Sequence, residues 1–149
     1  MFKILGWNAR TTFSKHQIYS VKTILNVSKP DFFLIVDSGK YRSNMAPDIP
    51  LYSVIHHLDT LVIFYKKEIS VSGLMPKEWS KHAMAVTVTL NNKSMILVNS
   101  YRRPNDQEAI HKIEAFINFL DRKYESTPII LFGDLNFPRN KVEKKFINL

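Results

Sequence analysis

The chain has 149 residues, of which 45% are hydrophobic and 12% aromatic, enough for one domain with a core and too few for two. It contains no cysteine, which excludes a disulfide framework, a thiolate zinc site and a cysteine nucleophile. The formal net charge is +8, and a surplus of lysine and arginine on a small domain favours a polyanionic partner. We expect nucleic acid rather than an anionic membrane surface, with a merely basic, soluble protein as the alternative.

The sequence shows no targeting signal and no candidate membrane span. No apolar run approaches the length that crosses a bilayer, and the N-terminal sequence MFKILGWNAR alternates as a strand does. A soluble protein of an intracellular compartment is therefore expected. The many Lys, Asn, Ile and Phe residues fit an AT-rich gene, such as one of an organelle genome, and the compartment itself stays open.

The N-terminal part of the chain predicts a strand, a helix and a second strand. The first strand is expected from Phe2 to Asn8. Apolar residues then recur at helical spacing from Lys15 to Ser28, with Ser14 as a plausible N-cap. The wholly apolar run from Phe32 to Val36 is typical of a strand buried on both faces. A strand, a helix and a second strand in this order are typical of the start of an α/β layered domain.

The middle of the chain predicts further strands separated by loops. Residues Gly39 to Pro50 have a loop-like composition. Two strands are expected at Leu51 to His56 and Leu61 to Tyr65, and Glu68 to Ser72 is expected to extend the same sheet. Residues 73–82 predict irregular structure.

The last part predicts a hairpin, a helix and a final strand. Polar and apolar residues alternate over Ala83 to Leu90 and over Ser94 to Tyr101. Residues 106–124 carry an apolar stripe at helical spacing. Pro128 to Phe132 predicts an apolar strand, after which Gly133 opens a loop. Since no internal repeat or linker is visible, we expect a single domain over the whole chain.

Polar residues stand at, or one or two residues past, the C-terminal ends of several predicted strands. In layered α/β domains such strand ends gather along one rim, where sites are commonly built. The residues that we expect to converge on such a rim are Asn8, Asp37, Tyr101, Asp134 and Asn136.

The sharpest local motif is Gly-Asp-Leu-Asn at residues 133–136. Side chains at positions i and i+2 after a strand can point the same way, so Asp134 and Asn136 could polarise a water or hold a phosphoryl oxygen. Asp37 would be a hard oxygen ligand suited to Mg²⁺, with Asn8 as a neutral partner for a metal-bound water or a phosphate. An ordinary turn is the alternative, because Gly, Asp and Asn all favour turns.

A basic group follows the predicted strand that ends at Tyr101. The tyrosine hydroxyl and the forked donors of Arg102 and Arg103 suit phosphate contact, and Asn105 is expected to bind nucleic acid with them. Arg10, after the first strand, is expected on the same basic rim. The alternative is an aromatic residue at the sheet edge beside two solvated arginines.

The histidines and the tryptophan at position 79 give weaker signals. None of the five histidines has a carboxylate at a sequence spacing that suggests a catalytic dyad or a metal site. Trp79 with Lys77 and Lys81 could stack on a base, although a partly buried loop aromatic is the commoner arrangement.

The motifs of this chain follow one another in an order that resembles a known protein family. The chain runs I-L-G-W-N-A-R, a helix, K-P-D-F-F-L-I-V-D-S, L-V-I-F-Y-K-K, I-L-V-N-S-Y-R-R-P-N, a helix and T-P-I-I-L-F-G-D-L-N. This resembles the endonuclease/exonuclease/phosphatase superfamily, and looks most like the AP-endonuclease-like domains of non-LTR retrotransposons, from Phe2 to about Phe137. The resemblance implies an α/β (α+β) fold, a partial two-sheet β-sandwich with flanking helices, and metal-dependent phosphodiester cleavage.

The resemblance also implies a role for each rim residue. By position, Asn8 would help to bind Mg²⁺ and phosphate, and Asp37 falls where the family has a metal-binding Glu. Tyr101 would touch the scissile phosphate or order the site, and Asp134 would activate the attacking water. Asn136 would help to hold the phosphate. In-line attack at phosphorus needs such positioning and charge stabilisation.

Two departures from the family pattern bear on activity. Asp37 is one methylene shorter than the expected Glu. The family also places a further Asp and then a Ser-Asp-His motif in the second half of the domain, whereas this sequence ends soon after Asn136 with RNKVEKKFINL. We therefore expect a C-terminally truncated domain whose open sheet surface is covered by a second polypeptide, a large assembly or RNA.

Three functional hypotheses remain open from the sequence. The chain could be half of a split nuclease completed by another chain, or a gene fragment of a longer nuclease. It could instead be a catalytically inactive, basic RNA-binding or scaffold subunit of a ribonucleoprotein such as a ribosome. The truncation and Asp37 favour this last hypothesis, and the isolated chain is expected to be inactive. The sequence does not distinguish DNA from RNA as the partner.

Overall fold

The computed structural model describes residues 2–10, 15–39, 49–57, 60–74, 81–90 and 92–136. The predicted N-cap Ser14, most of the predicted loop before Pro50, Trp79 with Lys77, and the basic C-terminal segment lie outside these residues. Neither helix in the described ranges is both long enough and apolar enough to cross a membrane.

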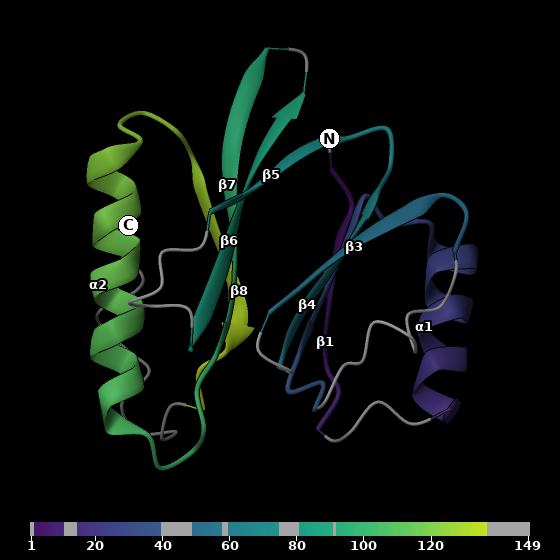
Figure 1. Ribbon diagram of the computed structural model, residues 1–149, viewed down its shortest axis with the longest axis horizontal. Helices are drawn as coiled ribbons and strands as arrows, with labels where there is room; N and C mark the ends of the chain where they lie inside the picture. The colour runs from purple at the N-terminus through teal and green to yellow at the C-terminus, as the bar shows by residue number, and fades with distance from the viewer. Residues whose placement is uncertain are drawn as a thin grey trace.

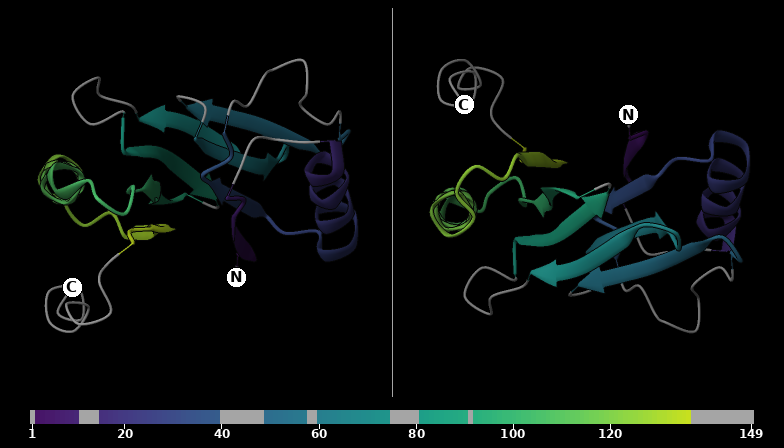
Figure 2. Two further views of the ribbon diagram at one scale, coloured as in Figure 1. Left: turned by 90° about the horizontal axis from the view of Figure 1, so that it is seen from below. Right: turned by 90° about the horizontal axis from the view of Figure 1, so that it is seen from above.

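The described residues form two four-stranded sheets and two helices (Figure 1). We name the sheet with strand order β1-β2-β4-β3 sheet A, and the sheet with order β5-β6-β7-β8 sheet B. The sheets face each other, α1 covers the outer face of sheet A, and α2 covers the outer face of sheet B (Figures 1 and 2). The predicted two-sheet sandwich with flanking helices is confirmed. The elements are β1 (Ile4–Asn8), α1 (Lys15–Ser28), β2 (Phe32–Val36), β3 (Tyr52–His57), β4 (Leu61–Lys66), β5 (Ser70–Leu74), β6 (Ala83–Leu90), β7 (Lys93–Tyr101), α2 (Gln107–Lys123) and β8 (Ile129–Asp134).

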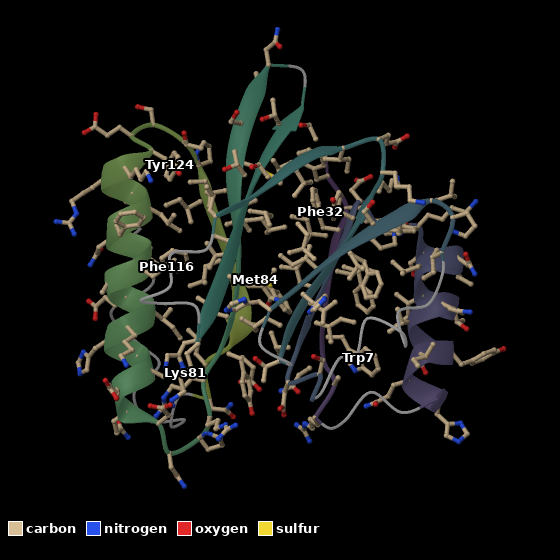
Figure 3. The ribbon with its side chains drawn as sticks, viewed as in Figure 1. Trp7, Phe32, Lys81, Met84, Phe116 and Tyr124 are labelled. Atoms are coloured by element: carbon tan, nitrogen blue, oxygen red, sulfur yellow. The ribbon has the colours of Figure 1, made fainter. Side chains whose placement is uncertain are left out.

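Strand β2 is buried along its whole length because both of its faces are covered. Phe33 and Ile35 pack in the cluster beneath α1, while Phe32 and Leu34 pack in the cluster between the sheets. Met84 of β6 meets this second cluster from sheet B, and Figure 3 shows it facing Phe32 across the sandwich. The continuous apolar run is thus explained by burial on both faces, as predicted.

One strand lies in a different sheet from the one predicted. Residues Glu68–Ser72 were expected to extend the sheet of β3 and β4, but β5 pairs antiparallel with β6 in sheet B. The chain turns tightly after β4, where the Ile69 N–H donates to the carbonyl of Lys66 at 3.0 Å. Ile69 is buried in the cluster between the sheets, so this turn carries the chain across from sheet A to sheet B.

A buried polar side chain links the two sheets. Asn99 of β7 has no exposed surface, and its Nδ2 donates to the carbonyls of Ile35 at 3.0 Å and Val62 at 3.3 Å. These carbonyls belong to β2 and β4 of sheet A, in paired positions. The link matters because Asn99 stands two residues before Tyr101, and Ile35 two residues before Asp37.

Replacing this link with an apolar side chain of similar size should destabilise the fold. Asn99→Leu removes both donors and leaves buried carbonyls without their partner, which costs about 1–3 kcal/mol. Urea denaturation should show that loss in the free energy of unfolding. Asn118→Leu, on an exposed position of α2, is the matched control and should change stability little. Equal stability of the two variants would show that the Asn99 link contributes nothing.

Candidate active site

The strand pairing brings the predicted polar residues to one end of the sandwich. In sheet A, β1 and β2 are parallel, so Asn8 pairs with Val36 and lies next to Asp37. In sheet B, β7 and β8 are parallel, and Tyr101 pairs with Asp134. The carboxyl ends of these four strands therefore share one edge, which we call the rim.

Asp134 is the centre of a hydrogen-bonded group at the rim. Its Oδ2 accepts from Nδ2 of Asn8, which joins sheet B to sheet A, and its Oδ1 accepts from the N–H of Asn136 at 3.0 Å. The Asn8 Oδ1 accepts in turn from the N–H of Arg10 at 3.0 Å. Both oxygens of the carboxylate are thus fixed in direction, and each carboxylate oxygen can accept more than one bond.

Asn136 is held by the main chain of the neighbouring loop. Its φ is 45°, a conformation that Asn adopts more readily than most residues. Its Nδ2 donates to the carbonyl of Arg102 at 2.6 Å. The loop after β8 is therefore tied to the loop after β7, so the two side chains of the Asp-Leu-Asn segment have set positions.

The Tyr101 hydroxyl and the Asp37 carboxylate form the second contact between the sheets at the rim. Burial raises the pKa of Tyr101, and the negative charges of Asp37 and Asp134 raise it further. Tyr101 therefore keeps its proton at neutral pH and donates a hydrogen bond. Asp37 has a φ of 52°, so the chain turns sharply where β2 ends.

Gly133 lies inside a strand instead of opening a loop. Strand β8 continues through Asp134, and Gly133 pairs with Ser100. A Cβ at this position would lie 2.2 Å from the main-chain oxygen of Ser100, so any side chain would push the two strands apart. The absence of a side chain allows β8 to reach the rim with Asp134 as its last residue.

The two adjacent arginines occupy different environments. Arg102 has no exposed surface, and its guanidinium donates to the carbonyls of Pro104, Asp106, Leu135 and Asn136 at 2.7–3.2 Å. The prediction that Arg102 contacts nucleic acid does not fit this burial, because its nitrogens are committed to the main chain. By contrast, Arg103, Asn105 and Arg10 are exposed.

This difference between the arginines gives a direct test. Arg102→Met should lower the free energy of unfolding by about 3 kcal/mol or more, because four partly buried carbonyls lose a donor that is charged and itself fully buried. Arg103→Met is the adjacent control and should leave stability within about 0.5 kcal/mol. Urea denaturation measures both variants. A stable Arg102→Met protein would contradict the assignment of a structural role to this side chain.

A small cavity lies beside Tyr101, and the sequence did not predict it. Its volume is about 130 Å³. The cavity opens next to the end of β7 and is lined from both sheets. The lining residues are Thr60, Lys81, His82, Tyr101, Arg103 and Asp106.

The cavity contains a histidine–carboxylate pair that no sequence spacing revealed. His82 is 6% exposed, and its Nδ1 lies 4.0 Å from Oδ2 of Asp106, which caps the N-terminus of α2. The two residues are far apart in the sequence but meet because the Tyr101 N–H donates to the carbonyl of His82 at 2.9 Å. Burial lowers the pKa of His82, although the charge of Asp106 acts in the opposite direction.

The lowered pKa of His82 predicts a loss of stability in acid. Protonation is less favourable in the folded than in the unfolded chain, so the free energy of unfolding falls as the pH drops below about 6.5. Urea denaturation at about pH 7 and about pH 5 should show a smaller decline for His82→Gln than for the wild type. His111→Gln, on the exposed face of α2, should decline as the wild type does. An equal decline in all three proteins would contradict the prediction.

The oxygen atoms at the rim fit a hard divalent cation. No three Asp, Glu, His or Cys side chains in the described ranges lie close enough to form a metal-binding group. Mg²⁺, however, commonly takes one or two carboxylates and completes its shell with water and substrate phosphate. Asp37 and Asp134 supply carboxylates near the amide of Asn8, which is compatible with that chemistry.

Comparison with known proteins identifies the fold. No protein-family model and no curated protein matches the sequence. The endonuclease domain of TRAS1, a telomere-specific non-LTR retrotransposon, matches with a TM-score of 0.73 at 17% identity, over 94% of this chain and 61% of that domain. The catalytic domain of human Nocturnin, with a bound sulfate anion, gives 0.69 at 11% identity, over 92% and 64%. A mannosyl-6-phosphatase of Bacteroides thetaiotaomicron gives 0.68 at 14%, over 94% and 67%.

The chain therefore has the endonuclease/exonuclease/phosphatase fold, as the order of its motifs predicted. Within this class, one of the structures that it resembles is a retrotransposon endonuclease domain, the branch that the sequence motifs indicated. The chain spans about 61–67% of the length of these three solved chains.

Proposed function

We propose that the rim is part of a Mg²⁺-dependent site that cleaves phosphodiester bonds in nucleic acid. The observation that carries the proposal is the hydrogen-bonded group of Asn8, Asp134 and Asn136, with the Tyr101–Asp37 pair beside it. These side chains come from both sheets and from four strand ends, so no single turn explains their meeting. The net charge of +8 supports a polyanionic substrate.

In this proposal each rim residue acts on the phosphate or on the attacking water. Asp134 accepts a proton from the water, whose oxygen forms a bond to phosphorus while the bond to the leaving oxygen breaks. The protonated Tyr101 hydroxyl and the amides of Asn8 and Asn136 orient the phosphate oxygens. Mg²⁺ bound near Asp37 would neutralise charge that develops on the phosphate.

We propose that further strands and a further catalytic group complete this site. Among the described elements, β1 pairs only with β2, and β8 pairs only with β7, so the neighbouring edges of both sheets are open beside the rim. Most side chains of β1 and β8 are only partly buried, and Ile130 is 39% exposed. A second chain or another segment of the same protein would cover this surface and supply the group that protonates the leaving oxygen.

The test is cleavage by the protein purified from its source. With Mg²⁺, the native protein should nick supercoiled plasmid or cut single-stranded RNA, and Asp134→Asn should lower the rate at least about a hundredfold by removing the base. Asp121→Asn, on the exposed face of α2, is the matched control and should keep the wild-type rate. Native protein that cuts neither substrate with Mg²⁺ or Mn²⁺ would exclude the catalytic proposal.

A non-catalytic role is the second candidate, and specific observations favour it. The Tyr101 hydroxyl already engages the carboxylate of Asp37, which is also shorter than the glutamate of the family pattern. In this case the chain is a basic, RNA-associated scaffold subunit of a ribonucleoprotein such as a ribosome. Native sedimentation separates the candidates, because only the subunit should migrate in a large particle that ribonuclease collapses.

A further inference from the structure

The rim continues past the Asn8–Asp134 and Asp37–Tyr101 pairs to a third pair of residues, Thr60 and His82. Across sheet B, His82, Tyr101 and Asp134 are lateral neighbours, because the Tyr101 N–H bonds to the His82 carbonyl and Tyr101 pairs with Asp134. Across sheet A, the Ser38 N–H donates to the carbonyl of Thr60 at 3.3 Å, which places Thr60 beyond Asp37. Neighbouring strands lie about 4.8 Å apart, so His82, in the wall of the cavity beside Tyr101, lies roughly 10 Å from Asp134.

The charge changes sign along this line of residues. Asp134 and Asp37 make the first part of the rim acidic. The cavity at the other end has the cations Lys81 and Arg103 in its wall, both on exposed residues, and Figure 3 shows Lys81 at this end of the molecule.

Polar uncharged side chains form another part of the same cavity wall. The hydroxyl-bearing side chains of Thr60 and Tyr101 and the imidazole of His82 line it together with the two cations. The single anion in the wall, Asp106, has one oxygen committed to the N–H of Ala109 at 3.0 Å and the other 4.0 Å from His82. A set of two cations with neutral donors suits a phosphate group.

We propose that this cavity binds a second phosphate of the same nucleic-acid strand, next to the phosphate held at Asn8 and Asp134. The inference rests on the proposed function for the position of the first phosphate. Tyr101 stands between the two positions. A volume of about 130 Å³ is large enough for a phosphate group with water.

A second phosphate site would define the substrate class of the rim. The fold itself does not define it, since the matched structures include an endonuclease domain and a mannosyl-6-phosphatase. A site for one phosphate serves either substrate, whereas two phosphate sites in line select a polynucleotide strand over a small phosphate ester. The cavity therefore favours a strand as the ligand.

The experiment measures the affinity gained from one added phosphate. Binding of a dinucleotide with a single internal phosphate is compared with binding of the same dinucleotide carrying an additional terminal phosphate, at either end. Isothermal titration with Ca²⁺ in place of Mg²⁺ keeps a divalent cation at the carboxylates, and recovery of intact dinucleotide afterwards shows that no cleavage occurred during the measurement. Deoxyribose and ribose forms are titrated in parallel, so that the preferred strand is identified.

The added phosphate should strengthen binding about tenfold at one of the two ends in the wild-type protein, as expected for charge-assisted hydrogen bonds. Lys81→Gln with Arg103→Gln should remove most of that gain. Lys22→Gln with Lys67→Gln loses the same charge at exposed positions away from the cavity, and should retain the gain. His82→Gln tests whether the imidazole contributes to it.

The outcomes separate this inference from the proposed function. No gain from the added phosphate in the wild type, or an equal gain in both double variants, would overturn the second phosphate site even if the native protein cleaves nucleic acid. A gain lost only in the Lys81 and Arg103 double variant supports the site even if cleavage is absent. In that case the cavity belongs to a binding subunit and the catalytic proposal alone fails.

Discussion

The rim depends on two close approaches between the sheets, each two residues before a pair of rim side chains that join the sheets. Asn99 holds β7 against the paired carbonyls of Ile35 and Val62, and two residues further on Tyr101 reaches Asp37. At Gly6, a Cβ would lie 1.9 Å from the ring of Phe132, so β1 and β8 approach closely only because this side chain is absent. Two residues further along these strands, Asn8 reaches Asp134. The distance between the sheets is thus set inside the core, and the contacts at the rim follow from it.

The loops at the rim are fixed by main-chain acceptors. The buried guanidinium of Arg102 donates hydrogen bonds to carbonyls in the loop after β7 and in the loop after β8. The side-chain amide of Asn136 in turn donates to the carbonyl of Arg102. A rigid planar donor suits this task better than a flexible ammonium, because its fork satisfies several carbonyls at once. One arginine of the adjacent pair therefore stabilises the geometry, and its exposed neighbour Arg103 stays available to a ligand.

Much of the fold follows from sequence periodicity, and the site follows only in part. The bounds of α1, β2 and β6 agree with the predicted ones because their apolar patterns are complete over their length. Periodicity does not reveal which sheet a strand joins, which is why β5 was placed in the wrong one. The polar residues at the strand ends predicted the rim, because parallel pairing of β1 with β2 and of β7 with β8 brings those strand ends together. Sequence gave no signal for the burial of Arg102, and none for the meeting of His82 with Asp106, because both depend on tertiary contacts.

The distribution of charge along the rim gives a physical reason for a nucleic-acid ligand beyond the net charge of the chain. A chain with a formal charge of +8 would attract polyanions anywhere on its surface, without selecting one position. At the rim, however, two carboxylates from different sheets are held close to neutral amides and a protonated tyrosine, which favours a bound cation there. The exposed cations Lys81 and Arg103 lie at the adjacent cavity. A strand whose first phosphate meets a cation at Asp134 and Asp37, and whose second phosphate meets those two side chains, would be fixed in both register and direction. If the proposed strand binds, non-specific attraction would bring it to the surface, and this alternation of charge would determine where on the surface it is held.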